Sequence, residues 1–188
     1  MTTLSDVRSE HDDGEGTKRR IHWFGETDAT ELMASGVMTA PAMTPEMTNA
    51  YATSPIHEGV AVRVLFQDNS PDGFSLVHAW FGEDYPLPRH THSADCMYYV
   101  LKGELRMGAK TIHSGEGLLI PAGRPYTYRA GPGGAEVLEF RTTSSFDMQI
   151  LDKDPARWQA FAATAVAMAP VWIQTRPDWA QEFIASGA

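Results

Sequence analysis

Two histidines separated by one residue, His90 and His92, are the residues best suited to chemistry in this chain. A β-strand alternates its side chains between two faces, so both imidazoles would point to the same side. Strand-forming residues follow as far as a turn glycine, Gly103. Such a segment could place imidazoles around a metal ion inside a β-barrel. The only cysteine, Cys96, comes shortly after His92, and its thiolate would be a good ligand for zinc, copper or iron.

The composition argues against several classes of function. The chain has 188 residues, enough for one domain with appendages, and its formal net charge is −9. An acidic surface is a poor match for nucleic acid or an anionic membrane, and no apolar run approaches the roughly 18 residues of a membrane span. The first residues lack the order of a signal peptide. A single cysteine cannot form an internal disulfide, which indicates a cytoplasmic protein.

From residue 58 onward the sequence is typical of a β-protein. Val60–Phe66 is rich in β-branched residues, and Phe74–Phe81 alternates as a returning strand would. Further short strands are expected at 96–101, 104–107, 110–113, 117–120, 125–129 and 135–142. Glycines lie between or beside them. Many short strands at this spacing favour an all-β barrel or sandwich.

The barrel is expected to carry segments at both ends. The predicted divisions are a flexible tail at 1–20, an N-terminal arm at 21–57, the barrel at 58–146 and a C-terminal helical segment packed on the barrel at 147–188. A capping-box pattern at Asp28–Glu31 predicts a short helix in the arm, and Asp154 before a proline predicts the start of a C-terminal helix. Residues 37–55 could form an irregular cover, a lid or an arm exchanged in a dimer.

The segment 82–128 resembles the two sequence motifs of the cupin superfamily. The first motif is matched at Gly82, His90, His92 and Gly103, and the second at Gly115, Pro121 and Gly123. The resemblance implies a single-domain cupin, a double-stranded β-helix or jelly-roll barrel, with a short N-terminal arm and C-terminal helices. It also implies a homodimer, since cupins often pair through sheet edges and N-terminal arms.

The resemblance also implies a metal site, in which two usual ligands are replaced. Cupins usually hold the metal with three histidines and a glutamate. His90 and His92 match by position, whereas Cys96 takes the glutamate position and Tyr126 that of the third histidine. The implied cofactor is a divalent transition metal, one of Fe, Zn, Ni, Mn or Cu. The alternative is a metal-free pocket with hydrogen-bonded histidines, in which Cys96 is a small buried apolar residue.

Strand alternation predicts which side chains line the pocket. Cys96 and Tyr98 share a face, and so do Tyr126 and Tyr128. The predicted substrate-binding residues are Trp80, His78, Tyr98, Tyr128 and Arg124. An aromatic wall of this kind would suit an aromatic or otherwise apolar small molecule, and Arg124 could meet a substrate carboxylate. The alternatives are that the rings simply fill the barrel and that the arginine is a solvated surface residue.

Two functions follow from these residues. One is a metal-dependent enzyme acting on a small organic molecule, dioxygenase-like by resemblance, with isomerase and lyase as further options. Tyr126 or Tyr98 would then be the catalytic proton donor or orienting group. The other is a metal-free module that binds or senses a small molecule. The metal content of the protein distinguishes them.

Overall fold

The computed structural model describes residues 21–183, and in them the prediction of an all-β barrel with an antiparallel sheet is confirmed. The strands are β1 Thr30–Glu31, β2 Met38–Thr39, β3 Val60–Gln67, β4 Ser75–Phe81, β5 His90–Thr91, β6 Cys96–Met107, β7 Lys110–His113, β8 Gly117–Ile120, β9 Arg129–Arg141, β10 Phe146–Asp147 and β11 Gln149–Ile150. The helices are α1 Pro45–Thr53 and α2 Pro155–Thr175, with 3₁₀ turns η1 Glu26–Asp28, η2 Ile56–Gly59 and η3 Asp178–Glu182. The tail predicted at 1–20 lies outside the described residues.

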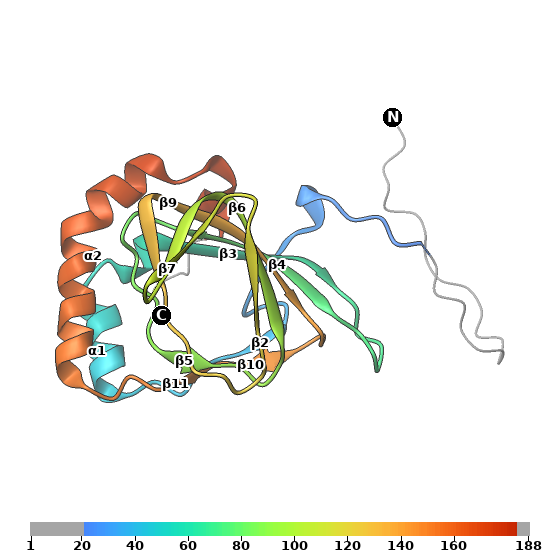
Figure 1. Ribbon diagram of the computed structural model, residues 1–188, viewed down its shortest axis with the longest axis horizontal. Helices are drawn as coiled ribbons and strands as arrows, with labels where there is room; N and C mark the ends of the chain where they lie inside the picture. The colour runs from blue at the N-terminus through green and yellow to red at the C-terminus, as the bar shows by residue number, and fades with distance from the viewer. Residues whose placement is uncertain (1–20, 184–188) are drawn as a thin grey trace.

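One large antiparallel sheet supplies most of the barrel. Its strand order is β1-β3-β4-β9-β6-β7, with β8 also paired to β6. Two short pairs, β2 with β10 and β5 with β11, complete the β-structure. Figure 1 shows the strands curving into a ring, with β2, β5, β10 and β11 together on one side of it and both α-helices beside another.

Strand β6 alternates as the sequence predicts. Cys96 and Tyr98 are buried, whereas the exposed fractions of Met97 and Tyr99 are 51% and 48%. The same alternation buries Tyr126 and Tyr128 on either side of an exposed Thr127. The period of two therefore identifies which side chains of these segments enter the barrel.

Helix α2 is fixed to the barrel by Trp172. The helix begins where the sequence predicts, because the Asp154 carboxylate accepts a hydrogen bond from the Ala156 N–H at 2.9 Å. The Trp172 side chain is wholly buried, and its indole N–H donates to the backbone oxygen of Glu83 at 2.6 Å. Its ring lies directly over Gly82. No helix in residues 21–183 has the length and apolar character needed to cross a bilayer.

The N-terminal arm differs from the sequence prediction in two places. The helix predicted at Asp28–Glu31 is absent, because Thr30–Glu31 instead pairs with strand β3. Tertiary pairing outweighs the local capping signal there. Helix α1, which was not predicted, begins after Thr44, whose hydroxyl oxygen accepts a hydrogen bond from the Met47 N–H at 3.2 Å.

Gly82 is expected to tolerate no side chain. A Cβ atom at this position would lie 2.2 Å from Cδ1 of the buried Trp172 ring. We expect Gly82→Ala to lower the free energy of unfolding by about 1–3 kcal/mol, measured by urea denaturation. Gly25→Ala is the control, because the nearest atom to its Cβ would be 3.9 Å away. Equal effects of the two substitutions would contradict this account of how α2 docks.

Candidate functional site

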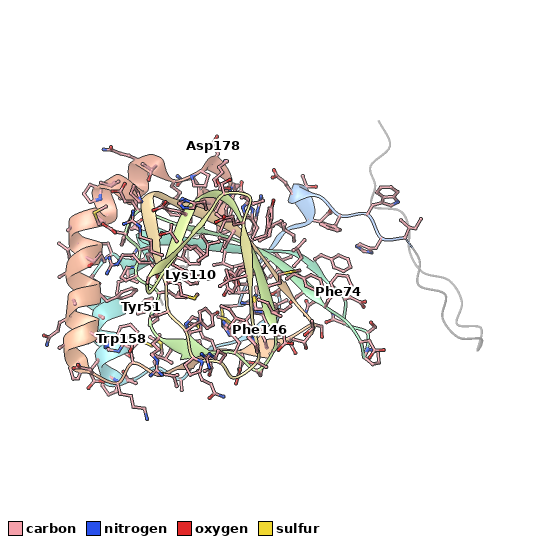
Figure 2. The ribbon with its side chains drawn as sticks, viewed as in Figure 1. Tyr51, Phe74, Lys110, Phe146, Trp158 and Asp178 are labelled. Carbon is pink, nitrogen blue, oxygen red and sulfur yellow. The ribbon has the colours of Figure 1, made fainter. Side chains whose placement is uncertain are left out.

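A cavity of about 270 Å³ lies inside the barrel. The N-terminal arm supplies much of its wall, through Leu32, Met38, Pro41, Met43, Met47 and Tyr51. The side chains in its lining that carry polar groups are His90, His92, Glu139, Arg141, Tyr51, Tyr85, Tyr98 and Tyr128. Tyr51 and Phe146, labelled in Figure 2, line the cavity from α1 and β10. The cavity therefore lies between the arm and the sheet. Most of its wall is apolar, and the polar groups occupy a part of it.

Backbone pairing fixes the two histidines. His90 lies in β5, opposite Ile150 of β11, and exchanges two backbone hydrogen bonds of 3.0 Å with Tyr126. Nδ1 of His90 lies 2.8 Å from the backbone oxygen of Pro88. Nδ1 of His92 lies 2.6 Å from the backbone oxygen of Asp147. Because a carbonyl oxygen can only accept, each Nδ1 must carry the proton, which leaves a lone pair on each Nε2.

Both imidazoles are neutral near pH 7. Burial is the larger cause and the nearby positive charge of Arg141 a further one, and together they lower the pKa of His90 to about 4 and that of His92 to about 3. The ring centroids of the two histidines are 4.8 Å apart. The pair therefore offers two neighbouring acceptor atoms, suited to a hydrogen-bond donor or to a metal ion.

Three tyrosines pack beside the histidines. The hydroxyl oxygens of Tyr98 and Tyr126 are 2.6 Å apart, so one phenol donates to the other. The Tyr126 ring centroid lies 4.2 Å from that of His90 and 6.2 Å from that of Tyr128. Burial raises the pKa of all three phenols above the usual value of tyrosine. They remain neutral, so they can donate hydrogen bonds but would be poor bases or phenolate ligands.

Cys96 does not join the histidines. It is buried at the start of β6, opposite Ile120 on one side and Arg141 on the other. Burial raises its thiol pKa to about 12, which disfavours the thiolate. Within residues 21–183 no three His, Cys, Asp or Glu side chains are grouped closely enough to hold a metal ion.

The residues present therefore fit a resident metal poorly. Two neutral imidazoles supply two donors, but a third anionic or imidazole donor is not grouped with them in the described part of the chain. The Glu139 carboxylate on the cavity wall is already engaged by the buried guanidinium of Arg141. Both features disfavour a bound cation, and no chemical step is assigned to a metal.

The orientation expected for His78 and Trp80 is corrected by strand β4. Val77 and Phe81 line the cavity, so the alternating His78 and Trp80 face the other side of the sheet. There the His78 ring lies 4.2 Å from that of Trp179. Its Nδ1 accepts a hydrogen bond from Arg63, and its Nε2 lies 3.2 Å from the Glu136 carboxylate.

Arg124 also lies away from the cavity. Its side chain is exposed and is not part of the cavity wall. Asp95 is exposed as well, and its carboxylate accepts a hydrogen bond from the Ala122 N–H at 2.7 Å. Of the predicted substrate-binding residues, the cavity wall contains Tyr98 and Tyr128.

Sequence analysis missed two charged residues that line the cavity, Glu139 and Arg141. Both are on β9, and their exposed fractions are 7% and 2%. Nη2 of Arg141 donates to Oε2 of Glu139 at 2.6 Å, and the guanidinium carbon lies 3.8 Å from the Phe146 ring centroid. The alternation of the strand was the signal that could have identified them. Glu139 and Arg141 share one face of the predicted strand and Leu138 and Phe140 share the other, so one of these two pairs must face inward.

Comparison with solved structures returns proteins that are partly similar to this chain, one of them described as an RmlC-like cupin. KdgF from Halomonas sp. is 19% identical, with a TM-score of 0.40 over 45% of this chain and 79% of that protein. An RmlC-like cupin from Shewanella frigidimarina is 18% identical, with a TM-score of 0.40 over 45% of this chain and 77% of that one. Procruciferin, an 11S globulin from Brassica napus, is 16% identical, with a TM-score of 0.42 over 48% of this chain and 28% of its own.

These similarities concern the fold alone, and function has to be argued from the site. No protein-family model matches the sequence. No curated protein matches it either.

The two cavity histidines are expected to make stability depend on pH. Their folded-state pKa values, about 4 and about 3, lie below the unfolded value of about 6.5, so the unfolded chain binds more protons in this window. The free energy of unfolding should therefore fall as pH drops from 6.5 towards 4, by up to about 1.4 kcal/mol per pH unit for each histidine. Urea denaturation across this range measures the slope.

Two substitutions separate the contribution of His92 to this slope from the contributions of other titratable groups. His92→Asn retains a donor for the Asp147 carbonyl but does not titrate, so its slope should be shallower than that of the wild type. His113→Asn is the matched control, because that side chain is 61% exposed and lies outside the cavity wall, and its effect on the slope should be smaller than that of His92→Asn. A wild-type slope in the His92→Asn protein would show that His92 is not the depressed group.

Proposed function

We propose that this cupin-like barrel binds a small, largely apolar organic molecule in its cavity and does so without a metal. The observation that carries the proposal is the cavity itself, whose apolar wall converges with two neutral imidazoles held in place by backbone carbonyls. Small-molecule sites generally combine an apolar lining with a few fixed polar groups. Such a protein would carry or sense its ligand.

The histidines define what the polar part of the ligand must offer. Because Nδ1 of His90 and of His92 faces a carbonyl oxygen, both Nε2 atoms can only accept hydrogen bonds. A hydroxyl or N–H group on the ligand satisfies them. A ligand bearing only acceptors at this position would leave them without partners, at a cost of about 1–3 kcal/mol.

The methionine-rich arm suits a ligand that must enter. Met38, Met43 and Met47 line the cavity, and the flexible methionine side chain adapts to irregular ligand surfaces. Met43 is also 46% exposed, so it lies between the cavity and solvent. The arm would thus cover the bound molecule, which corresponds to the lid hypothesis for residues 37–55.

A metal-dependent enzyme is the second candidate. It is favoured by the hydrogen bonds from each Nδ1 to a carbonyl oxygen, since metal-binding histidines are usually oriented in this way. A metal held by His90 and His92, with Cys96 and Tyr126 as further ligands, would supply Lewis-acid or oxygen chemistry. The first proposal is preferred because the donors grouped in the cavity are too few.

Binding of a neutral probe tests the first proposal. We expect benzyl alcohol to raise the melting temperature of metal-stripped protein and to bind by calorimetry. Benzyl methyl ether, which has no donor for the imidazoles, should bind about five-fold more weakly because one hydrogen bond of roughly 1 kcal/mol is lost. If neither probe binds, the cavity is not a binding site for small apolar molecules.

A substitution at the cavity entrance locates the bound probe. Met43→Trp should weaken benzyl alcohol binding about ten-fold by filling the space between the cavity and solvent, a change of roughly 1.4 kcal/mol. Leu119→Trp is the matched control, because Leu119 is an exposed apolar residue that does not line the cavity. Equal weakening by both substitutions would place the probe elsewhere.

Metal content separates the two candidates. Protein purified without a histidine tag should contain well under one equivalent of metal by mass spectrometry, also after reconstitution with Fe, Zn, Ni, Mn and Cu in turn. A stoichiometric metal that is lost in His90→Gln would reverse the preference and favour the enzyme. Cys96→Ser and Tyr126→Phe would then show, by a lower metal affinity, whether these residues are ligands.

A further inference from the structure

Arg141 has hydrogen-bonding capacity that the protein does not use. Its side chain lines the cavity and is only 2% exposed, yet Nε and Nη1 have no hydrogen-bond partner in the described residues. Only Nη2 is engaged, by the Glu139 carboxylate. Buried donors are almost always paired, and leaving one unpaired costs about 1–3 kcal/mol. A group absent from the chain itself would account for these atoms.

The surroundings of Arg141 add a second unpaired group. Ser75 lies directly opposite Arg141 in the β4–β9 pairing, so the two side chains project to the same face. Its side chain is wholly buried, and its hydroxyl oxygen also has no partner in the described residues. The Phe146 ring covers one face of the guanidinium. A stacked ring leaves the N–H bonds free because they point outward in the guanidinium plane.

We propose that Arg141 is an anion subsite and that the natural ligand is a small apolar carboxylic acid. The carboxylate of this ligand would accept hydrogen bonds from the N–H groups of Arg141 that Glu139 leaves unused. A hydroxyl or N–H group elsewhere on the ligand would face His90 and His92. This inference rests on the proposed binding function and specifies its ligand class. A guanidinium has five N–H donors, so it can serve Glu139 and a ligand carboxylate together.

The charges set how large the preference should be. Arg141 is already paired with Glu139, so a second carboxylate enters a site whose formal charge is close to zero. The gain over an uncharged analogue therefore comes from charge-assisted hydrogen bonds rather than from the meeting of two isolated charges. We expect a preference of about ten-fold for the carboxylate, which corresponds to roughly 1.4 kcal/mol.

Benzoate and acetophenone form the decisive probe pair, since they differ little in shape, neither donates a hydrogen bond, and they differ in charge at pH 7. Calorimetry on the full chain should give about ten-fold tighter binding for benzoate. In Arg141→Met the ratio of the two affinities should fall to about one. Arg141→Met leaves the buried Glu139 carboxylate without its ion-pair partner. The measurement is therefore repeated in the double variant E139Q/R141M, which has no unpaired buried charge. Because the two ligands are compared within each variant, a general loss of affinity for both of them cancels from the ratio.

Arg124→Met is the matched control, because Arg124 is an exposed arginine outside the cavity wall, and it should keep the ten-fold ratio. Equal binding of benzoate and acetophenone to the wild type would overturn the subsite, as would a benzoate preference that survives in E139Q/R141M. Binding of benzyl alcohol without any benzoate preference overturns the subsite alone. Failure of all these probes to bind overturns both the subsite and the binding function.

Discussion

The buried guanidinium of Arg141 is the constraint on which the barrel interior depends. A cation removed from water is costly unless nearby groups compensate it. Here Glu139 supplies the charge and Phe146 supplies a ring face. Both the carboxylate and the guanidinium reach the interior because the first part of β6 pairs with β9 in a regular register, with Glu139 opposite Tyr98 and Arg141 opposite Cys96. A slip of one residue would turn both charges outward, so this register is fixed by the charges as well as by the apolar residues.

The cavity wall also determines which groups the two histidines can bind. Their Nδ1 atoms face backbone carbonyls of Pro88 and Asp147, which come from two separate segments. The orientation of the His92 imidazole thus depends on the chain returning after β9 to lie beside β5, whereas that of His90 is set by the residues just before it. Burial and the Arg141 charge keep the rings neutral. The cavity therefore presents acceptors from the histidines and donors from Arg141.

Sequence reasoning succeeded where one local period decides the outcome. The period of two correctly buries Tyr98 and Tyr128 and locates the histidine pair. It failed for His78 because both faces of β4 are covered, the outer one by η3 through Trp179. Hydrophobicity cannot distinguish two buried faces. Arg141 was missed for a related reason: charged residues on strands usually face solvent, and its compensation by Phe146 depends on a turn of the chain that no local pattern specifies.

The groups around the histidines explain why two neighbouring imidazoles need not hold a metal ion. An imidazole whose Nδ1 is bound to a carbonyl presents the same Nε2 lone pair to a metal ion and to a hydroxyl group. What differs is the electrostatic cost. A bound cation needs anionic ligands, but the Glu139 carboxylate is already paired with Arg141, and the thiol of Cys96 and the phenol of Tyr126 are neutral. A hydroxyl or N–H donor needs no such charge, so the two imidazoles can accept hydrogen bonds from an organic group where a metal ion would be disfavoured.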